Sequence, residues 1–346
     1  MRALPEKNPE NSQLKQNIAM QILHHTDLAP RHSLACPSIA RELVLIESAD
    51  EWRTAAPGDR ILGGGSNTIC REEIKTRILC PQYRGQRIIG EDSDSVLLQV
   101  QAGEPWCAVA AWSASEGWYG AENLALIPGS AGAAPVQNIG AYGVELQHIL
   151  ESVQVYDRDE RRLRDIPAAD CRFAYRDSRF KHDWRARYII SAITLRLSKR
   201  GTLHTAYPGL REQADDLHHP ADVHAAVSAL RRGKLPDPAA LPNAGSFFHN
   251  PVVSSAQYAA LREKHPAMPS FAAGADAVKI PAAWLIEQSG FKGARDGKVG
   301  IYAEHALVLV NYGGTATEIL AFAAEIQRAI QSRYGLALNI EPTVLA

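Results

Sequence analysis

The sequence contains few of the features that mark a secreted, metal-binding or membrane protein. Its 346 residues include five cysteines, an odd number at wide spacings and without a Cys-x-x-Cys pair. This pattern argues against a disulfide framework or a zinc site and suits a reducing compartment. The 12 histidines show no metal-ligand spacing, no apolar run could span a bilayer, and the polar N-terminus lacks the apolar stretch of a signal peptide. These absences predict a soluble, cytoplasmic protein without a metal site.

The chain also lacks an excess of charge of either sign. Lys and Arg total 37 and Asp and Glu total 38, so the formal net charge is −1. A protein this balanced has no overall field to hold nucleic acid or an anionic membrane. We therefore expect neither as a partner. An anionic small molecule would have to be met by local positive charge or by backbone N–H groups.

Alternation of strands and helices with short connections indicates an α/β or α+β protein. Strands are predicted at 93–103, 150–157, 186–197, 306–311 and 336–345, and helices at 105–117, 221–232, 281–290 and 316–334. Thr315 and Glu318 form a capping box for the last helix. Pro236 and Pro238 mark a boundary into a further unit.

Two segments are rich in glycine. In "GGGSN" (63–67), three glycines after a strand let backbone N–H groups approach a diphosphate, although the same pattern also suits a tight turn. It is not the G-x-G-x-x-G fingerprint, so a Rossmann interpretation is poor. In "LIPGSAGAAPVQNIGAYGVEL" (126–146), small residues alternate with apolar ones. This regularity favours a cofactor-lining loop over a flexible linker.

The segment "NAGSFFHNP" (243–251) sets one hydroxyl, that of Ser246, between Gly245 and two phenylalanines, Phe247 and Phe248. Taken alone, the segment leaves two interpretations open. Ser246 could cap its own backbone in a turn, or it could deliver a proton inside a dry pocket.

The glycine segments, in this order, resemble the flavin-binding half of the UDP-N-acetylenolpyruvoylglucosamine reductases. These are FAD enzymes of bacterial cell-wall precursor synthesis within the vanillyl-alcohol-oxidase-like superfamily, and the chain is most similar to their type I members. The resemblance runs from about residue 22 to the end. Its other motifs are "CRFAYRDSRFK" (171–181), "RRGKLPDP" (231–238), "NAGSFFHNP", "AAWLIEQSGFKG" (282–293), "HALVLVN" (305–311) and "IEP" (340–342).

The resemblance implies an α+β fold with a two-subdomain FAD-binding module of the vanillyl-alcohol-oxidase type and a C-terminal α+β substrate-binding domain. After a polar tail at 1–20, the expected parts are subdomain 1 at 21–83 joined by the last strand at 336–346, subdomain 2 at 84–235, and the substrate-binding domain at 236–335. It also implies a monomer with a nucleotide-sugar substrate.

The implied reaction is the NADPH-dependent reduction of UDP-N-acetylglucosamine enolpyruvate to UDP-N-acetylmuramate. Hydride passes from NADPH to FAD and then to the enolpyruvyl group. The match makes Ser246 the proton donor and Arg176 the residue that holds the substrate carboxylate. Glu341 faces the same carboxylate, so a raised pKa is expected. Phe247 and Phe248 would help to keep water away.

The resemblance also assigns binding residues. For the flavin, held non-covalently because Asn67 stands where many relatives have an attachment histidine, these are Gly63, Gly64, Gly65, Ser66, Asn67, Pro128, Gly129, Ser130, Gly132, Ala133, Gln137, Asn138, Gly140, Ala141 and Tyr142. For the nucleotide sugar they are Tyr175, Tyr207, Lys234, Asn250 and Lys292.

The chain departs from the family pattern at four places. His32-Ser33-Leu34 replaces Asn-Thr-Phe, Phe271 replaces a nucleotide-contacting tyrosine, and His305 is unusual. The family tail usually carries two nearby acids, whereas this chain offers Glu341 alone. Two rival functions remain at this stage, a flavin oxidase for another substrate and a non-catalytic sugar-nucleotide sensor.

Overall fold

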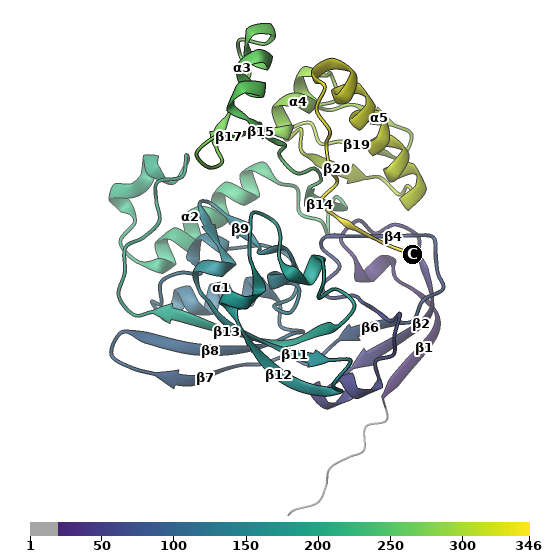
Figure 1. Ribbon diagram of the computed structural model, residues 1–346, viewed down its shortest axis with the longest axis vertical. Helices are drawn as coiled ribbons and strands as arrows, with labels where there is room; N and C mark the ends of the chain where they lie inside the picture. Colours follow the sequence, from purple (N-terminus) through teal and green to yellow (C-terminus); the bar gives the residue numbers. More distant parts are fainter. Residues whose placement is uncertain (1–19) are drawn as a thin grey trace, which may run out of the picture.

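The computed structural model describes residues 20–346, so nearly all of the polar tail expected at 1–20 lies outside the described residues. A lower unit holds the two larger sheets. An upper unit, formed by residues 243–338, stands above it (Figure 1). Helices and strands are mixed throughout, which confirms the α+β class.

The first sheet of the lower unit is partly parallel. It contains β1 (Gln21–Asp27), β2 (Ile39–Ile46), β6 (Ile78–Pro81) and β3 (Arg60–Ile61) in that order, with β5 (Glu73–Ile74) also paired to β2. Strands β2, β6 and β3 run parallel to one another, and the second half of β2 and all of β6 are buried. Burial on both faces is usual for parallel strands. Strand β3 ends just before the "GGGSN" segment and so fixes where that segment starts.

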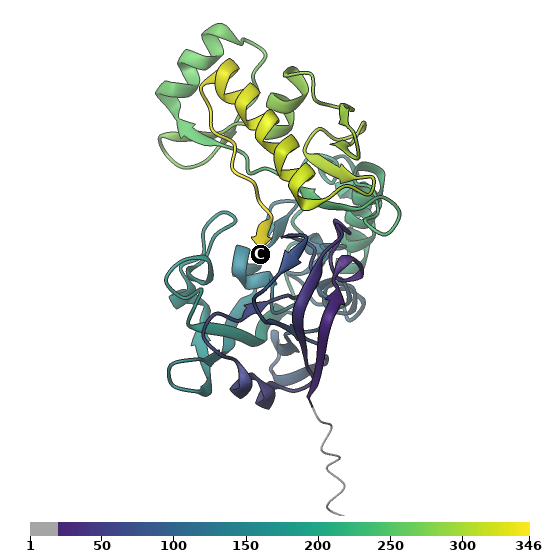
Figure 2. The same ribbon diagram turned by 90° about the vertical axis from the view of Figure 1, so that its right-hand side faces the viewer.

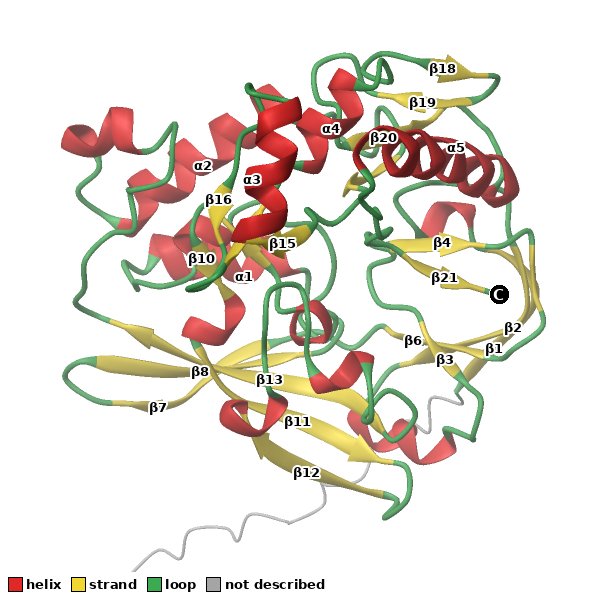
Figure 3. Ribbon diagram, turned by 45° about the horizontal axis from the view of Figure 1, so that its top comes forward, coloured by secondary structure: helices red, strands yellow, loops and turns green. Residues whose placement is uncertain are grey.

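The second sheet is antiparallel throughout. Its order is β12 (Arg162–Pro167), β11 (Leu150–Asp157), β13 (Tyr188–Ser198), β8 (Ser95–Gln101) and β7 (Gln86–Glu91). Two helices, α1 (Trp106–Ser115) and α2 (Pro220–Lys234), pack on each other beside this sheet (Figure 3). Residues 140–145 form a small hairpin of β9 (Gly140–Ala141) and β10 (Val144–Glu145).

The upper unit is built from two smaller sheets and three helices. One sheet has the order β14 (Asn243–Ser246), β20 (Val308–Asn311), β19 (Val299–Ile301) and β18 (Arg295–Asp296). The other contains β15 (Val252–Ser254), β17 (Ala277–Lys279) and β16 (Phe271–Ala272). The helices are α3 (Ser255–Lys264), α4 (Ala282–Gln288) and α5 (Ala316–Tyr334).

Helix α5 forms as the sequence predicts. The capping box of Thr315 and Glu318 closes its first turn, and Gly335 ends it in the left-handed conformation with φ 68°. Its apolar stripe is buried in the core of the upper unit. Short 3-10 helices occupy Ala29–Arg31, Ala49–Thr54, Glu122–Leu124, Ala134–Gln137, Leu146–His148, Ala168–Cys171, Arg179–Lys181 and Arg211–Asp216.

The C-terminal segment departs from the single strand expected at 336–345. Its middle pairs with the upper unit, where Phe248 and Ile340 form an antiparallel bridge. After Pro342, β21 (Thr343–Leu345) pairs in parallel with β4 (Thr68–Cys70) of the lower unit. Proline has no N–H to donate, so one continuous ladder cannot form here. The segment therefore runs down from the upper to the lower unit (Figure 2).

Among residues 20–346, no helix is both long and apolar enough to cross a membrane.

Asn311, at the end of β20, connects the two units. Its side chain is 1% exposed and donates to the carbonyl of Leu34 at 2.7 Å and to that of Gly314 at 3.1 Å. Its Oδ1 accepts from the backbone N–H of Gly314 at 2.6 Å. One amide thus pairs buried backbone groups from both units.

We expect Asn311→Ala to lower the free energy of unfolding by roughly 2–4 kcal/mol, because several buried backbone groups lose their partners. Urea unfolding followed by tryptophan fluorescence measures this loss. The exposed Asn339 supplies the control, and Asn339→Ala should unfold close to the parent. Equal midpoints for Asn311→Ala and the parent would contradict this account.

Candidate active site

The two glycine segments are in direct backbone contact. A Cβ added to Gly64 would lie 2.8 Å from the Cα of Gly129, and one added to Gly63 would lie 2.7 Å from the Oγ of Ser130. Real Cβ atoms do not approach other atoms so closely. Glycine is therefore required here for close approach of one loop to the other, which goes beyond the needs of a tight turn.

Residues 31–33 support the first glycine segment from behind. Gly65 has φ 62°, and a Cβ there would lie 2.2 Å from the carbonyl oxygen of Arg31. The backbone N–H of Ser33 donates to the carbonyl of Gly65 at 3.1 Å, and the Ser33 hydroxyl donates to that of Ser66 at 3.3 Å. The unusual residues at 32–34 thus meet the loop largely through backbone groups and a small hydroxyl.

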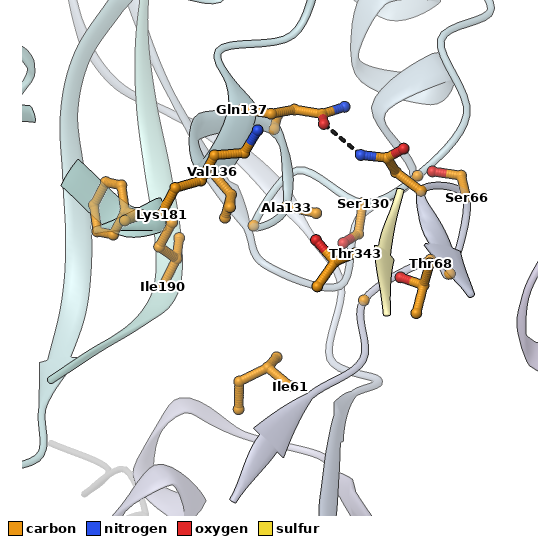
Figure 4. A pocket seen from close by; sticks show the side chains of 18 of the residues that line it. Ile61, Ser66, Thr68, Ser130, Ala133, Val136, Gln137, Lys181, Ile190 and Thr343 are labelled. Atoms are coloured by element: carbon orange, nitrogen blue, oxygen red, sulfur yellow. Dashed lines mark hydrogen bonds between the residues drawn. The ribbon is translucent and has the colours of Figure 1, made fainter. Parts of the chain in front are cut away.

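A cavity of about 500 Å³ lies where the glycine segments, β13 and the C-terminal segment meet. Figure 4 shows side chains that line it, including Ile61, Ser130, Gln137 and Thr343. Most of the residues expected to bind the flavin are among its lining: Gly63, Gly64, Gly65, Ser66, Asn67, Pro128, Gly129, Ser130, Gly132, Ala133 and Gln137. The volume lies in the range of ordinary ligand sites, about 300–1,000 Å³.

The lining offers hydrogen-bond donors that the protein itself does not use. Within residues 20–346, no acceptor is paired with the backbone N–H groups of 63–67. The hydroxyl of Ser130 is buried and has no partner among the same residues. A row of free N–H groups with an orphan hydroxyl suits a diphosphate. The residues present therefore fit an FAD diphosphate.

Four residues expected at the flavin lie off the cavity lining: Asn138, Gly140, Ala141 and Tyr142. Asn138 is buried and its amide donates to the Glu145 carboxylate at 2.8 Å. Gly140 accepts from the Arg176 guanidinium, and Tyr142 packs edge-on against Tyr207 with 5.0 Å between ring centres. Their place in flavin binding stays a prediction, and the structure gives Asn138, Gly140 and Tyr142 contacts of their own.

Ser246 is exposed, whereas the two phenylalanines after it are buried. A register shift lies between Asn243 and Ser246, and Gly245 has φ 69°. Such bulges re-aim a side chain. Phe247 and Phe248 pack in the core of the upper unit, and the expectation that they help to keep water away stays a prediction. Their burial anchors the strand that presents Ser246.

Arg176 and Glu341 meet, although they come from distant parts of the sequence. The guanidinium Nε lies 3.7 Å from Oε1 of Glu341, and its NH2 donates to the carbonyl of Gly140 at 2.7 Å. The backbone N–H of Glu341 donates to the carbonyl of Phe247 at 2.8 Å. This bond places Glu341 beside the residue that follows Ser246, so all three expected catalytic residues belong to one region.

Burial raises the pKa of the Glu341 carboxyl, and the charges of Arg176 and Lys181 oppose this rise. The raised pKa agrees with the expectation. The expected cause was the neighbouring substrate carboxylate, whereas the cause here is burial. His249 Nδ1 lies 3.7 Å from Oε2 of Glu341. Burial and the charges of Lys181 and Arg176 lower the pKa of His249 to about 4, so the imidazole is neutral near pH 7.

Tyr175 and Asn250, two of the residues expected at the substrate, come together at the interface of the units. Tyr175 is 41% exposed, and the ammonium of Lys279 lies 4.2 Å from its ring centre. A side-chain hydrogen bond from Asn250 lowers the pKa of Tyr175, against the larger rise caused by burial. Asn250 also caps α4 by accepting from the N–H of Ala282 at 2.8 Å.

Lys234 and Lys292, two further expected substrate residues, lie near His305. Burial lowers the pKa of His305, and the two lysine charges lower it further. Lys292 pairs with Glu287 at 3.0 Å. His305 thus lies near two lysines, one of which is paired with an acid. Phe271, the other unusual residue of this unit, is 56% exposed and lies opposite Lys279 in the strand register.

Sequence reasoning assigned no role to Lys181, His249 or Thr343, yet all three line the cavity. Lys181 and His249 belong to the motifs "CRFAYRDSRFK" and "NAGSFFHNP", so membership of these motifs was the available signal. Arg158, from the turn after β11, also lines the cavity. No motif points to it, because it reaches the cavity only through strand pairing.

Comparison with known families identifies both halves of this arrangement. Residues 58–165 match the family model of an FAD binding domain. Residues 237–345 match that of the C-terminal domain of UDP-N-acetylenolpyruvoylglucosamine reductase. The reductase of that name from Pseudomonas aeruginosa is 39% identical over 339 residues, covering 94% of this chain and 100% of the relative. The reductase from Cupriavidus pinatubonensis is 45% identical over 310 residues, and this match covers 89% of this chain and 92% of the relative.

The chain belongs to the UDP-N-acetylenolpyruvoylglucosamine reductase family. A solved structure of a UDP-N-acetylenolpyruvylglucosamine reductase, from Thermus caldophilus, has the same fold, with a TM-score of 0.68. The two sequences are 23% identical, and the match covers 94% of this chain and 99% of the chain in that structure. The resemblance drawn from the sequence is therefore confirmed for the family and for the fold.

We expect Gly64→Ala to weaken FAD binding by roughly tenfold to a hundredfold. Its Cβ would press on the backbone of Gly129, a strain of about 1–3 kcal/mol that displaces the free N–H groups. Titration of apoprotein with FAD, followed by flavin fluorescence, measures the dissociation constant. Gly233, which has open space around its Cβ position, supplies the control Gly233→Ala. If Gly64→Ala bound FAD as tightly as the parent, the close contact between the two glycine segments would not be needed for FAD binding.

Proposed function

We propose that this chain reduces UDP-N-acetylglucosamine enolpyruvate to UDP-N-acetylmuramate with NADPH as the hydride donor and non-covalent FAD as the cofactor, using Ser246, Arg176 and Glu341. When bound, FAD supplies the hydride chemistry between NADPH and the carbon–carbon double bond. The observation that carries the proposal is the position of Glu341, which lines a cavity that fits a flavin, pairs with Arg176 and is bonded through its backbone to the residue after the exposed Ser246.

Arg176 holds the carboxylate of the enolpyruvyl group. A guanidinium presents a planar fork of donors that matches a carboxylate and spreads the charge that develops on it. One arm of Arg176 is already fixed by the carbonyl of Gly140, and Nε faces Glu341. This arrangement orients the group before substrate arrives, which reduces the cost of reorganisation.

Glu341 assists from the opposite side of the carboxylate. Its raised pKa favours the neutral acid, and a neutral carboxyl donates a hydrogen bond where an ionised one would repel a second anion. His249, with its pKa of about 4, adds no charge to this site near pH 7. The positive charge at the carboxylate then comes from Arg176.

Ser246 donates the proton. The Oγ–H bond breaks as a C–H bond forms at the enolate-like carbon, and the oxygen then recovers a proton from solvent, to which the exposed side chain has access. A hydroxyl is a weak acid in water, but a carbanionic carbon is a strong base. No permanent charge is therefore needed at this position.

Lys234, Lys292, Asn250, Tyr175 and Tyr207 bind the nucleotide part. The two lysines supply positive charge for the diphosphate. Tyr207 is 45% exposed on a loop that rests on Tyr142, so it can cover a bound ligand. Of the residues proposed for FAD, Asn138, Gly140, Ala141 and Tyr142 act by shaping the segment that carries the others.

Further parts of this proposal concern the protein as a whole. We place the enzyme in the bacterial cytoplasm as a monomer that supplies peptidoglycan synthesis, and hence cell shape and division. We divide it into FAD-binding subdomains at 21–83 with 336–346 and at 84–235, and a substrate-binding domain at 236–335. The pairing of β21 with β4 supports the assignment of the C-terminal segment to the same subdomain as residues 21–83.

The direct test mixes the purified protein with NADPH, with and without UDP-N-acetylglucosamine enolpyruvate, in a stopped-flow instrument. We expect NADPH to bleach the flavin absorbance and the enolpyruvyl substrate to restore it under anaerobic conditions. Reoxidation by oxygen alone, with no response to the substrate, would instead indicate a flavin oxidase.

Ser246→Ala should separate the two half-reactions. NADPH should reduce the flavin at nearly the parent rate, whereas reoxidation by substrate should fall about 10²–10⁴-fold, as expected for loss of a positioned proton donor. Ser246→Cys should recover part of the rate, because a thiol is the stronger acid. If the substrate reoxidised the flavin of Ser246→Ala as fast as that of the parent, Ser246 would be a turn residue and not the proton donor.

A further inference from the structure

Lys181 is a half-buried cation to which the reaction described above assigns no role. It ends the 3-10 helix Arg179–Lys181, lines the flavin cavity and is among the side chains drawn in Figure 4. Its ammonium donates a hydrogen bond of 2.8 Å to the backbone carbonyl of Arg176. The contact therefore holds the main chain of the very residue proposed to bind the substrate carboxylate.

The Arg176 backbone needs such support. Ala174 and Asp177 exchange two backbone hydrogen bonds, of 3.0 and 3.1 Å, which makes Tyr175 and Arg176 the centre of a tight turn. Arg176 has φ 55°, in the left-handed region that a side chain with a Cβ disfavours. A residue held in this conformation depends on its surroundings, and Lys181 supplies the bond to its carbonyl.

The charge of Lys181 also acts on the groups around Arg176. Glu341 of the C-terminal segment, Asp177 and Arg176 of the turn, and His249 after β14 are the charged and titratable groups that face it. Burial lowers the pKa of Lys181, and Glu341 and Asp177 raise it. In return Lys181 lowers the pKa of both Glu341 and His249.

We propose that Lys181 is a positioning residue for the carboxylate of the substrate, fixing the Arg176 turn by its hydrogen bond and placing its charge in the cavity that Glu341 also lines. This inference rests on the proposed function. It adds a residue that touches neither the reacting carbon nor the double bond, and it predicts a specific pattern of binding and pH dependence.

The test compares Lys181→Met, which removes both donor and charge, with Lys181→Arg, which keeps both. Lys199 supplies the matched control, because its ammonium also donates to a backbone carbonyl, that of Asp92 at 2.7 Å, but far from the cavity. For each variant, calorimetry gives the Kd of the enolpyruvyl substrate across pH, and stopped flow gives flavin reduction by NADPH.

Lys181→Met should raise the substrate Kd tenfold or more while flavin reduction by NADPH stays within about twofold of the parent. Substrate binding weakens as pH rises through the pKa of Glu341, because the ionised carboxyl repels the substrate anion. Loss of the Lys181 charge raises the pKa of Glu341 and of His249, so this weakening should occur at higher pH. Lys181→Arg should restore the parent profile, and Lys199→Met should keep it.

The outcomes separate the two proposals. Parent protein that binds the substrate but does not reduce it would refute the proposed function, while the Kd comparison at Lys181 would still stand. If the parent is active and the Lys181→Met variant keeps the parent's substrate Kd and pH profile, only the proposed role of Lys181 is refuted. If Lys181→Met loses its FAD, Lys181→Gln takes its place. A Lys181→Gln variant with a parent-like Kd and pH profile would overturn the proposal.

Discussion

The hydrogen bonds of the C-terminal segment are the constraint on which the candidate site depends. Residues 339–341 pair with the segment that follows Ser246, and β21 then pairs with β4 directly after the "GGGSN" loop. The Asn67 side chain also donates to the carbonyl of Glu341 at 3.4 Å. One short stretch of chain therefore fixes the acid relative to both the hydroxyl above and the flavin cavity below.

Burial then gives these groups their chemical character. A carboxyl and an imidazole 3.7 Å apart would form an ion pair in water, but here burial favours the neutral form of each. The guanidinium of Arg176 and the ammonium of Lys181 each donate to a backbone carbonyl, which fixes their positions. The site thus offers cations to an anion next to a carboxyl whose ionised form burial disfavours.

Sequence alone predicted the elements whose signals are local. Helix α5, with its capping box, stripe and terminal glycine, and strand β11 were found at the expected residues. The two glycine segments and their partnership were also foreseen. Lys181 and Arg158 were not, because their place at the cavity depends on packing between segments far apart. Phe247 and Phe248 lie in the core of the upper unit, and their expected part in keeping water away stays a prediction.

The departure at 32–34 shows why a change of side chain need not disturb a cofactor loop. His32 is buried, its Nε2 pairs with the carbonyl of Cys36 at 3.2 Å, and burial lowers its pKa. What the loop receives from this segment is backbone contact at Gly65 and one hydroxyl bond from Ser33. Any residue that keeps this backbone path preserves the contact. Gly64 and Gly65 cannot vary in this way, because the atoms nearest to an added Cβ belong to the main chain and have no room to move.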